Sequence, residues 1–161
     1  MAIALVRIDD RLIHGQVVEG WLPVLRASRV LVVSDAAASD QMQRQLMRLA
    51  LPEEVGLDVL PVEAACAAVR SAAAAPEKVL ILAPGPAEIL ALLEAGLKLE
   101  SVNVGGLHHQ AGHVRIGRAI FLSEADQKAL LAIVEKGVRL EGRAVPSEKE
   151  EDVAALLGGR A

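Results

Sequence analysis

Continuous runs of apolar residues, separated by segments of helical character, limit the folds open to this chain more than any other feature. A strand without polar alternation is typical of a parallel sheet that is buried on both faces. The runs occupy residues 2–8, 29–34, 57–62, 78–83 and 101–104. Strands that alternate with helices predict a single α/β domain over residues 1–161, with a mostly parallel central sheet and helices on both faces.

Helical patterns fill the intervals between these runs. The first helix is expected to begin near Gly15, and Pro23 is expected to kink or split it near residues 19–21, because proline lacks a backbone N–H. Ser39 or Asp40 can cap a later helix. Its apolar face is formed by Met42, Leu46, Leu49 and Ala50. Two more helices are expected at residues 63–73 and 87–96.

The C-terminal third has a different rhythm. Ser123-x-x-Asp126 resembles a capping box that opens a helix, and Ser147-x-x-Glu150 is expected to open the last one in the same way. Residues 138–145 alternate apolar and polar side chains, which predicts an antiparallel edge strand near the C-terminus. Residues 158–161 are expected to be a frayed tail.

Composition excludes several classes of function. Hydrophobic residues make up 53% of the chain and aromatic ones 1%, the net charge is −4, and no basic stripe is present, so nucleic acid is not an expected partner. The one cysteine, Cys66, excludes an internal disulfide and fits a reducing cytoplasm. No uncharged apolar run reaches the roughly 18 residues of a membrane span. We therefore expect a cytoplasmic protein without direct membrane insertion, which meets the membrane only through partners.

The segment from Arg7 to Val17 carries the candidate chemistry. It joins the first strand to the first helix, and His14 stands just before Gly15 at the helix start. The first N–H groups of a helix and its positive end favour anions, phosphate above all. Arg11 adds a planar donor fork suited to phosphate oxygens, and Gly15 with Gln16 forms the predicted phosphate-binding loop.

His14 is the predicted catalytic residue. A neutral imidazole can act as a nucleophile near pH 7, so His14 could accept a phosphoryl group and hold it. Asp9 or Asp10 is expected to bind the far ring nitrogen and fix the tautomer, and the sequence does not decide which. Arg7 either neutralises one of these carboxylates or adds positive field. The alternative is that a lone histidine at a helix start is a cap or a half-buried surface residue.

The contiguous run Arg7-Ile8-Asp9-Asp10-Arg11-Leu12-Ile13-His14-Gly15-Gln16-Val17 resembles the signature of the IIB component of the mannose/fructose/sorbose class of the bacterial sugar phosphotransferase system. The resemblance implies a mostly parallel sheet and the activity of a protein-N(pi)-phosphohistidine–sugar phosphotransferase. It implies that the Nδ1 atom of His14 accepts a phosphoryl group from a phosphohistidine on a IIA domain. The group would then pass to a sugar carried by the membrane IIC and IID components, with no cofactor.

The segment Asn103-Val104-Gly105-Gly106 resembles a second, weaker motif of that family. Glycines after a buried strand would bring backbone close to a phosphoryl group, although an ordinary strand-end turn explains them too. Gly105, Gly106 and Asp35 follow predicted strands, and ligands of open α/β sheets bind beyond the carboxyl ends of strands. Asp35 is expected to cap its helix, with a place in the pocket as the alternative. In the loop that follows, the family often has a methionine and a basic residue, whereas this chain has Leu107-His108-His109-Gln110.

Other functions are weaker. His108, His109 and His113 lack the companion ligands of a structural zinc site, so we expect no metal and regard them as surface histidines, which could lie at the docking face for the donor domain. A regulatory module phosphorylated on His14 that signals to a protein is the main alternative. A receiver domain and a nucleotide-binding domain are rejected, since their phosphoacceptor and glycine motifs are missing. Neither the sugar nor the oligomeric state follows from the sequence, and a homo-oligomer stays open.

Overall fold

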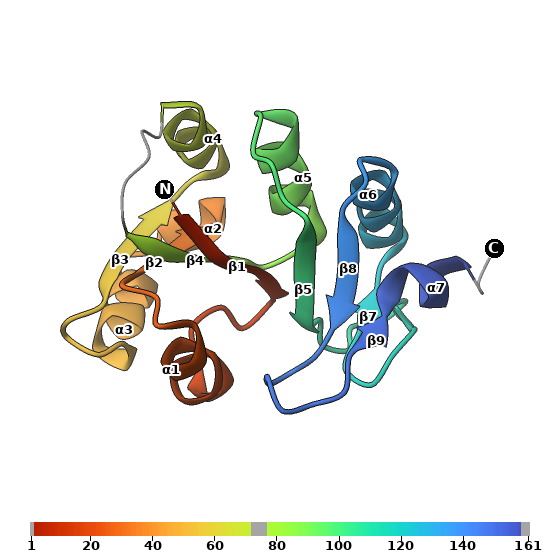
Figure 1. The fold of residues 1–161 in the computed structure, drawn as a ribbon, viewed down its shortest axis with the longest axis horizontal. Coiled ribbons are helices and arrows are strands. Elements are labelled where there is room, and N and C mark those ends of the chain that lie inside the picture. The colour runs from red at the N-terminus through yellow and green to blue at the C-terminus, as the bar shows by residue number, and fades with distance from the viewer. Residues whose placement is uncertain (1, 72–76, 159–161) are drawn as a thin grey trace.

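A seven-stranded sheet forms the centre of the computed structural model, which describes residues 2–71 and 77–158 (Figure 1). Its strands lie in the order β3-β2-β4-β1-β5-β8-β9, and all neighbours are parallel except β8 and β9. The predicted fold class is therefore confirmed. The strands are β1 (Ala2–Asp9), β2 (Arg29–Val33), β3 (Gly56–Leu60), β4 (Lys78–Ala83), β5 (Ser101–Gly106), β8 (Arg139–Gly142) and β9 (Glu151–Asp152). A separate antiparallel pair is formed by β6 (Val114–Arg115) and β7 (Phe121–Leu122).

Helices cover both faces of the sheet (Figure 1). One face carries α4 (Val62–Ser71), α5 (Pro86–Glu94), α6 (Glu124–Glu135) and α7 (Val153–Gly158). The other carries the π-helix η1 (Gln16–Trp21), α1 (Leu22–Leu25), α2 (Asp35–Ala38) and α3 (Gln41–Ala50). The helix predicted at 63–73 is described only to Ser71, and residues 159–161 of the predicted tail also lie outside the described residues.

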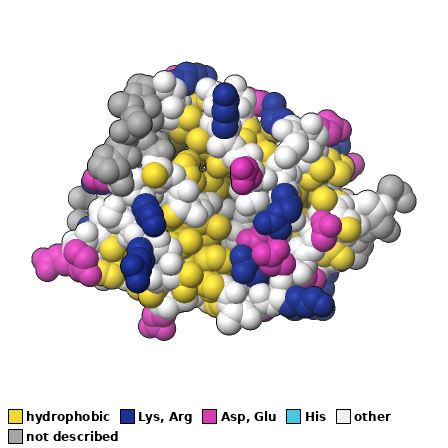
Figure 2. All heavy atoms as spheres, in the orientation of Figure 1, with side chains coloured by type: hydrophobic (Ala, Val, Ile, Leu, Met, Phe, Trp, Pro, Cys, Tyr) yellow, Lys and Arg dark blue, Asp and Glu magenta, His cyan; other side chains and the backbone are white. Residues whose placement is uncertain are grey.

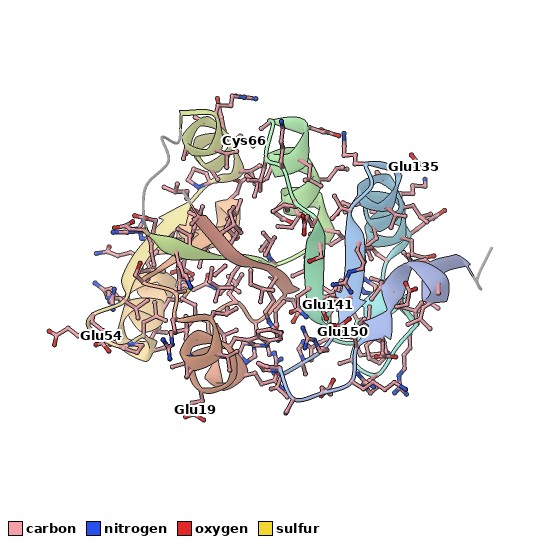
Figure 3. The ribbon with its side chains drawn as sticks, in the orientation of Figure 1. Glu19, Glu54, Cys66, Glu135, Glu141 and Glu150 are labelled. Atoms are coloured by element: carbon pink, nitrogen blue, oxygen red, sulfur yellow. The ribbon has the colours of Figure 1, made fainter. Side chains whose placement is uncertain are left out.

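The continuous apolar runs are explained by two cores on opposite faces of the sheet. On β2, Leu31 and Val33 face the core under α4–α7, whereas Val30 and Val32 face the core under η1 and α1–α3. Cys66 lies on α4 within the first core, with its Sγ 3.6 Å from the carbonyl oxygen of Ala91 on α5 (Figure 3). None of the helices within the described ranges has the length and apolarity that a membrane span requires.

Two predictions for the C-terminal part are wrong. The strand β8 is not at the edge: it pairs in parallel with β5, and the antiparallel edge strand is β9. The last helix begins at Val153, and its first turn is capped by Asp152, whose Oδ1 accepts the N–H of Ala155 at 3.2 Å. The box predicted from Ser147 does not form because the Glu150 carboxylate binds Arg139 instead, at 3.0 Å.

Other local predictions hold. Ser123 and Asp126 form a reciprocal capping box at the start of α6, and Asp40 caps α3 by accepting the N–H of Gln43. The first helix is divided as expected, since η1 gives way to α1 at residue 22 and Pro23 lies in the first turn of α1. One local prediction fails: the predicted apolar face of α3 does not pack on the core, because Met42, Leu46 and Leu49 are exposed and Met47 is buried in their place.

Candidate functional site

A tight turn after β1 returns the chain over the end of its own strand. The carboxylate of Asp9, the last residue of β1, accepts the N–H of Arg11 at 3.0 Å, and its carbonyl oxygen accepts the N–H of Leu12. Leu12 has a φ of +59°, in the left-handed region that costs a branched side chain about 1 kcal/mol or more. Its side chain is buried, and burial stabilises this backbone shape. The turn thereby brings His14 back to Asp9.

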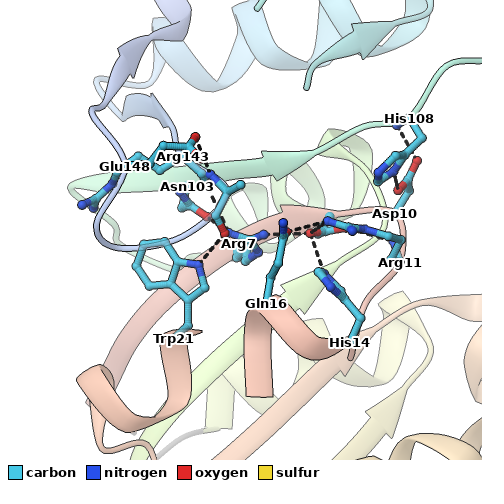
Figure 4. A network of polar contacts seen from close by, with 12 residues as sticks. Arg7, Asp10, Arg11, His14, Gln16, Trp21, Asn103, His108, Arg143 and Glu148 are labelled. Atoms are coloured by element: carbon cyan, nitrogen blue, oxygen red, sulfur yellow. Dashed lines mark hydrogen bonds and ion pairs between the residues drawn. The ribbon is translucent and has the colours of Figure 1, made fainter. Parts of the chain in front are cut away.

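The imidazole of His14 is held by one ring nitrogen. Its Nε2 lies 2.9 Å from Oδ2 of Asp9, and 16% of the side chain is exposed (Figure 4). A carboxylate can only accept, so Nε2 carries the proton and the lone pair of the neutral ring is on Nδ1. The carbonyl oxygen of His14 accepts from Val17 and Val18, which places the ring at the start of η1. The unoccupied nitrogen is the one that can act as a nucleophile.

Asp9 is a fully buried carboxylate between two guanidinium groups. Arg7 donates Nη2 to Oδ2 at 2.8 Å, and Arg11 donates Nε to Oδ1 at 3.2 Å. Burial alone would raise the pKa of the Asp9 carboxyl. The hydrogen bonds from His14 and Arg11, together with the charge of Arg7, outweigh burial and hold that pKa well below its usual range. Asp9 is therefore ionised and can orient the ring.

Arg11 brings positive charge to the open side of the site. Its side chain is 38% exposed, and Nη2 also donates to Oε1 of Gln16 at 2.7 Å (Figure 4). Its Nη1 donates no hydrogen bond within residues 2–71 and 77–158, so it can still bind an anion. Gly15 has ordinary helical backbone angles, and a Cβ there would meet nothing within 4 Å. The fold itself does not need glycine at this position.

Asp10 contacts a different histidine. Its Oδ2 accepts the backbone N–H of His108 at 2.7 Å, and its Oδ1 lies 2.5 Å from Nδ1 of the same residue. Of the two carboxylates proposed to orient His14, the structure thus places Asp9 beside that ring and Asp10 beside the 107–113 loop. Gly106 lies between the two groups, because a Cβ there would be 3.3 Å from His108 Cε1 and 3.4 Å from Arg11 Nη2.

The three loop histidines have separate surroundings, and the Nδ1 atom of His113 is buried without a hydrogen-bond partner among the described residues. His108 is bound by Asp10, and His109 packs edge-on against Phe121 with ring centroids 5.3 Å apart. Ligand atoms of Asp9, Asp10 and His108 do lie within 4.8 Å of one another, an arrangement that could hold a cation. Two guanidinium groups already balance Asp9, so a dication there would meet strong repulsion.

Arg7 lies deeper than the sequence suggested. It is fully buried and donates Nη1 to Oδ1 of Asn103 at 2.8 Å and to the carbonyl oxygen of Arg143 at 3.1 Å (Figure 4). Asn103 in turn donates Nδ2 to Oε1 of Glu141 at 3.0 Å. Burial lowers the pKa of Arg7, against the opposing charge of Asp9. Sequence reasoning did not single out Glu141, whose only signal was the polar alternation of β8 (Figure 3).

Trp21 joins this network to the connection between β8 and β9. Its Nε1 donates to the carbonyl oxygen of Ala144 at 2.9 Å, and the guanidinium carbons of Arg7 and Arg143 lie 5.6 and 5.2 Å from its ring centroid. A surface groove of about 480 Å³ runs between η1, α1 and this connection and reaches the His14 loop. It is lined by Gly15, Gln16, Glu19, Gly20, Val24, Val145, Pro146 and Ser147.

Asp35 lies just after the end of β2 and connects two helices. The cap of α2 is Ser34, whose Oγ accepts the N–H of Ala37 at 3.1 Å, so the predicted capping of this helix by Asp35 is wrong. Asp35 Oδ1 accepts the N–H of Val62 at 2.8 Å instead and fastens α2 to the start of α4. Position 34 lies at the strand end, where a β-region residue can cap, whereas Asp35 is already helical.

The surface around the fold is electrostatically mixed. On the face seen in Figure 2, acidic and basic side chains are interspersed among hydrophobic ones, in keeping with the net charge of −4. The site adds a local concentration of charge, in which His14 and the partly exposed guanidinium of Arg11 both bind the buried Asp9 carboxylate. This arrangement can attract an anionic electrophile and bind it covalently through Nδ1 of His14.

Comparison with known proteins points to one family. Residues 3–161 match the family model for the sorbose-subfamily IIB component of the PTS, the sugar phosphotransferase system. The chain is 36% identical over 157 residues to the PTS system fructose-specific EIIB component of Bacillus subtilis (strain 168), covering 98% of this chain and 96% of that protein. It is also 36% identical to the mannose-specific EIIAB component of Escherichia coli (strain K12), of which it spans only 49%.

A solved structure has the same fold. The crystal structure of the IIBSor domain of the sorbose permease from Klebsiella pneumoniae superimposes with a TM-score of 0.93 at 31% identity. The match covers 100% of this chain and 99% of that domain. The similarity therefore includes every element that builds the His14 loop.

Proposed function

This chain belongs to the sorbose-subfamily IIB components of the sugar phosphotransferase system, and on that premise we propose that His14 accepts a phosphoryl group from a phosphohistidine of a IIA domain. One observation carries the proposal. The buried carboxylate of Asp9 occupies Nε2 of His14 and leaves Nδ1 free, while Arg11 binds the same carboxylate. The protein would act as a protein-N(pi)-phosphohistidine–sugar phosphotransferase.

The transfer step needs no proton movement on His14. The lone pair of Nδ1 attacks phosphorus in line with the nitrogen–phosphorus bond of the donor, and this bond breaks as the new one forms. The donor imidazole leaves with the electron pair. The Nε2 proton stays in the hydrogen bond to Asp9, whose charge stabilises the positive ring that develops. Arg11, with the N–H groups of Gly15 and Gln16, binds the equatorial oxygens.

Onward transfer gives the protein its biological role. The phosphoryl group would pass from His14 to a sugar carried by the membrane IIC and IID components, so the chain would work in the cytoplasm and meet the membrane through these partners. The EIIAB relative bears both components in its name and is about twice the length of the aligned region, which supports a IIA domain as the donor. The relatives' names give fructose, mannose, sorbose and N-acetylgalactosamine, which leaves this chain's sugar unassigned.

A phosphoryl-transfer assay tests the proposal. The protein is mixed with phosphoenolpyruvate, the general phosphotransferase proteins and a IIA domain, and acid-labile phosphate is mapped. Label on His14 that moves to a sugar after addition of membranes with IIC and IID supports the full role. Label that goes no further favours a regulatory module, and a folded protein that takes no label from any donor contradicts the proposal.

A further inference from the structure

A row of three buried polar side chains crosses the sheet behind Asp9. Strand register pairs Arg7 with Asn103 and Asn103 with Glu141, across β1, β5 and β8. Their exposed fractions are 0, 0 and 4%. Buried charges cost several kcal/mol unless they are paired and hydrogen-bonded, so such a row calls for an explanation.

Asn103 fits this place in one orientation only. Its Oδ1 accepts from Nη1 of Arg7 at 2.8 Å (Figure 4). Its Nδ2 donates to Oε1 of Glu141 at 3.0 Å. An amide can accept on one side and donate on the other, whereas a carboxylate cannot donate to Glu141. Asn103 therefore separates a buried cation from a buried anion while it bonds to both.

The amide divides the four charges of the network into two pairs. Glu141 is paired with Arg143, whose Nε donates to Oε2 at 3.0 Å, and this hydrogen bond raises the pKa of Arg143. Arg7 is left to Asp9, which it binds at 2.8 Å on the same oxygen that holds His14. If Glu141 stood one strand closer, about 4.8 Å nearer, it would compete with Asp9 for Arg7.

We propose that Asn103 is a positioning residue for phosphoryl acceptance: its uncharged amide bridges Arg7 and Glu141 across the strand between them, so that Arg7 keeps Asp9 as its paired carboxylate. The inference rests on the proposed acceptor role of His14. The inference explains why Arg7, Asn103 and Glu141 are buried together, since the balance of charge around Asp9 decides how readily the His14 ring stays neutral and nucleophilic.

The direction of the effect follows from the charges that face the ring. Asp9 and Arg11, from β1 and the turn after it, flank His14, and Arg7 stands behind Asp9. The η1 side contributes Gln16, which is uncharged. A carboxylate at position 103 would add negative potential near the ring and draw Arg7 from Asp9. Both changes favour the charged imidazole, which cannot attack phosphorus.

The decisive experiment exchanges the amide and the carboxylate. The double variant Asn103→Asp/Glu141→Gln keeps a donor–acceptor pair between positions 103 and 141 and the same net charge, and it moves the negative charge one strand toward Arg7. It loses the contact from Asn103 Nδ2 to the carbonyl oxygen of Arg143 and one contact from Arg143 to position 141. Asn103→Asp alone places a carboxylate at position 103 against the carboxylate of Glu141, and this variant is expected to be less stable than wild type. Glu141→Gln alone is the matched control, because it removes the charge and leaves Asn103 in place.

The double variant is expected to be less stable than wild type but still folded under assay conditions, and to accept phosphoryl groups about three- to tenfold more slowly at pH 7. The deficit should shrink as the pH rises, because the added negative potential acts by keeping the ring charged. Glu141→Gln alone should be no slower than wild type. A double variant as fast as wild type at pH 7, or slow by one factor at every pH, would show that Asn103 is only structural and would overturn the inference.

A second readout does not depend on transfer. Ring ¹⁵N shifts give the charged fraction of His14 at pH 7 in the unphosphorylated protein, and this fraction should be larger in the double variant than in wild type. An unchanged fraction overturns the inference even if the wild-type protein takes no label. Absence of wild-type label, by contrast, contradicts the proposed function.

Discussion

A Cβ atom at position 105 would stand where the guanidinium carbon of Arg7 lies. The two residues come from neighbouring strands, β5 and β1, and the bare backbone of Gly105 forms one wall of the space that the buried guanidinium fills. The sequence predicts that this glycine admits backbone beside a phosphoryl group. In the structure, the space it leaves is occupied by the arginine that binds Asp9.

Gly105→Ala is therefore expected to displace Arg7 and break its buried pair with Asp9. The loss should be about 3 kcal/mol or more in the free energy of unfolding, the usual cost of a broken buried ion pair. Denaturant unfolding followed by Trp21 fluorescence measures it, since this single tryptophan is 3% exposed. Gly15→Ala is the control, because a Cβ there meets open space. Equal stability of the two variants would contradict the steric argument.

Acid should weaken the fold through Asp9. Its pKa is held below the ordinary value in the folded protein, so the ionised group stabilises the fold above the unfolded pKa of about 4 and loses this contribution as the pH falls further. Asp9→Asn is expected to be less stable than wild type at pH 7 and to show a flatter decline from pH 5 to pH 2. Urea unfolding at several pH values measures this, and parallel pH curves for the two proteins would refute the prediction.

The sequence predicts the fold well because its strands are long apolar runs, and such runs must be buried between two layers of helices. The prediction of an edge strand fails at Glu141, because an alternating pattern shows which residues are polar and does not show which are exposed to solvent. The polar residues of β8 look like a solvent-facing edge, yet Glu141 is buried against Asn103 and Arg143. The parallel pairing of β8 with β5 is a tertiary fact with no local signal.

At the site, residue types and spacing single out His14 and Arg11 but leave Asp9 and Asp10 equivalent. What separates the two carboxylates is the left-handed backbone of Leu12, which folds the turn toward Asp9. No residue type at position 12 signals this, because leucine seldom adopts a positive φ. A contact that depends on one unusual backbone dihedral, such as that of His14 with Asp9, cannot be predicted from the pattern of residue types.

Glu88 is expected to destabilise the protein at neutral pH. Burial raises the pKa of this carboxyl, and its Oε2 is buried without a hydrogen-bond partner among the described residues. Because the folded pKa is raised, the cost is full above that pKa and disappears below the unfolded value of about 4. Glu88→Gln should stabilise the fold by about 1 kcal/mol at pH 7 and by nothing near pH 4. Glu94→Gln, exposed on the same helix, is the control, and a gain independent of pH would refute the assignment.

His14→Ala should abolish labelling by a phosphorylated donor, because no other residue offers Nδ1 at this position. The measurement is incorporation of ³²P from phosphoenolpyruvate, with unfolding curves to show that the variant is folded. His109→Ala is the matched control, since that ring packs on Phe121. Full labelling of the His14 variant would remove this residue from the mechanism.

Arg11→Ala tests the electrostatic half of the proposal. The guanidinium is 38% exposed and its pair with Asp9 is partly screened, so its removal should change the free energy of unfolding by less than about 1 kcal/mol. Loss of one donor that binds a developing anion usually slows a reaction about a hundredfold or more. Single-turnover transfer from a phosphorylated IIA domain measures the rate, and Arg44→Ala on α3 controls for the loss of a surface charge. Arg11→Lys should recover part of the rate, because an ammonium group supplies charge without the planar fork. An unchanged rate in Arg11→Ala would mean that the phosphoryl group is bound by the backbone of the His14 loop alone.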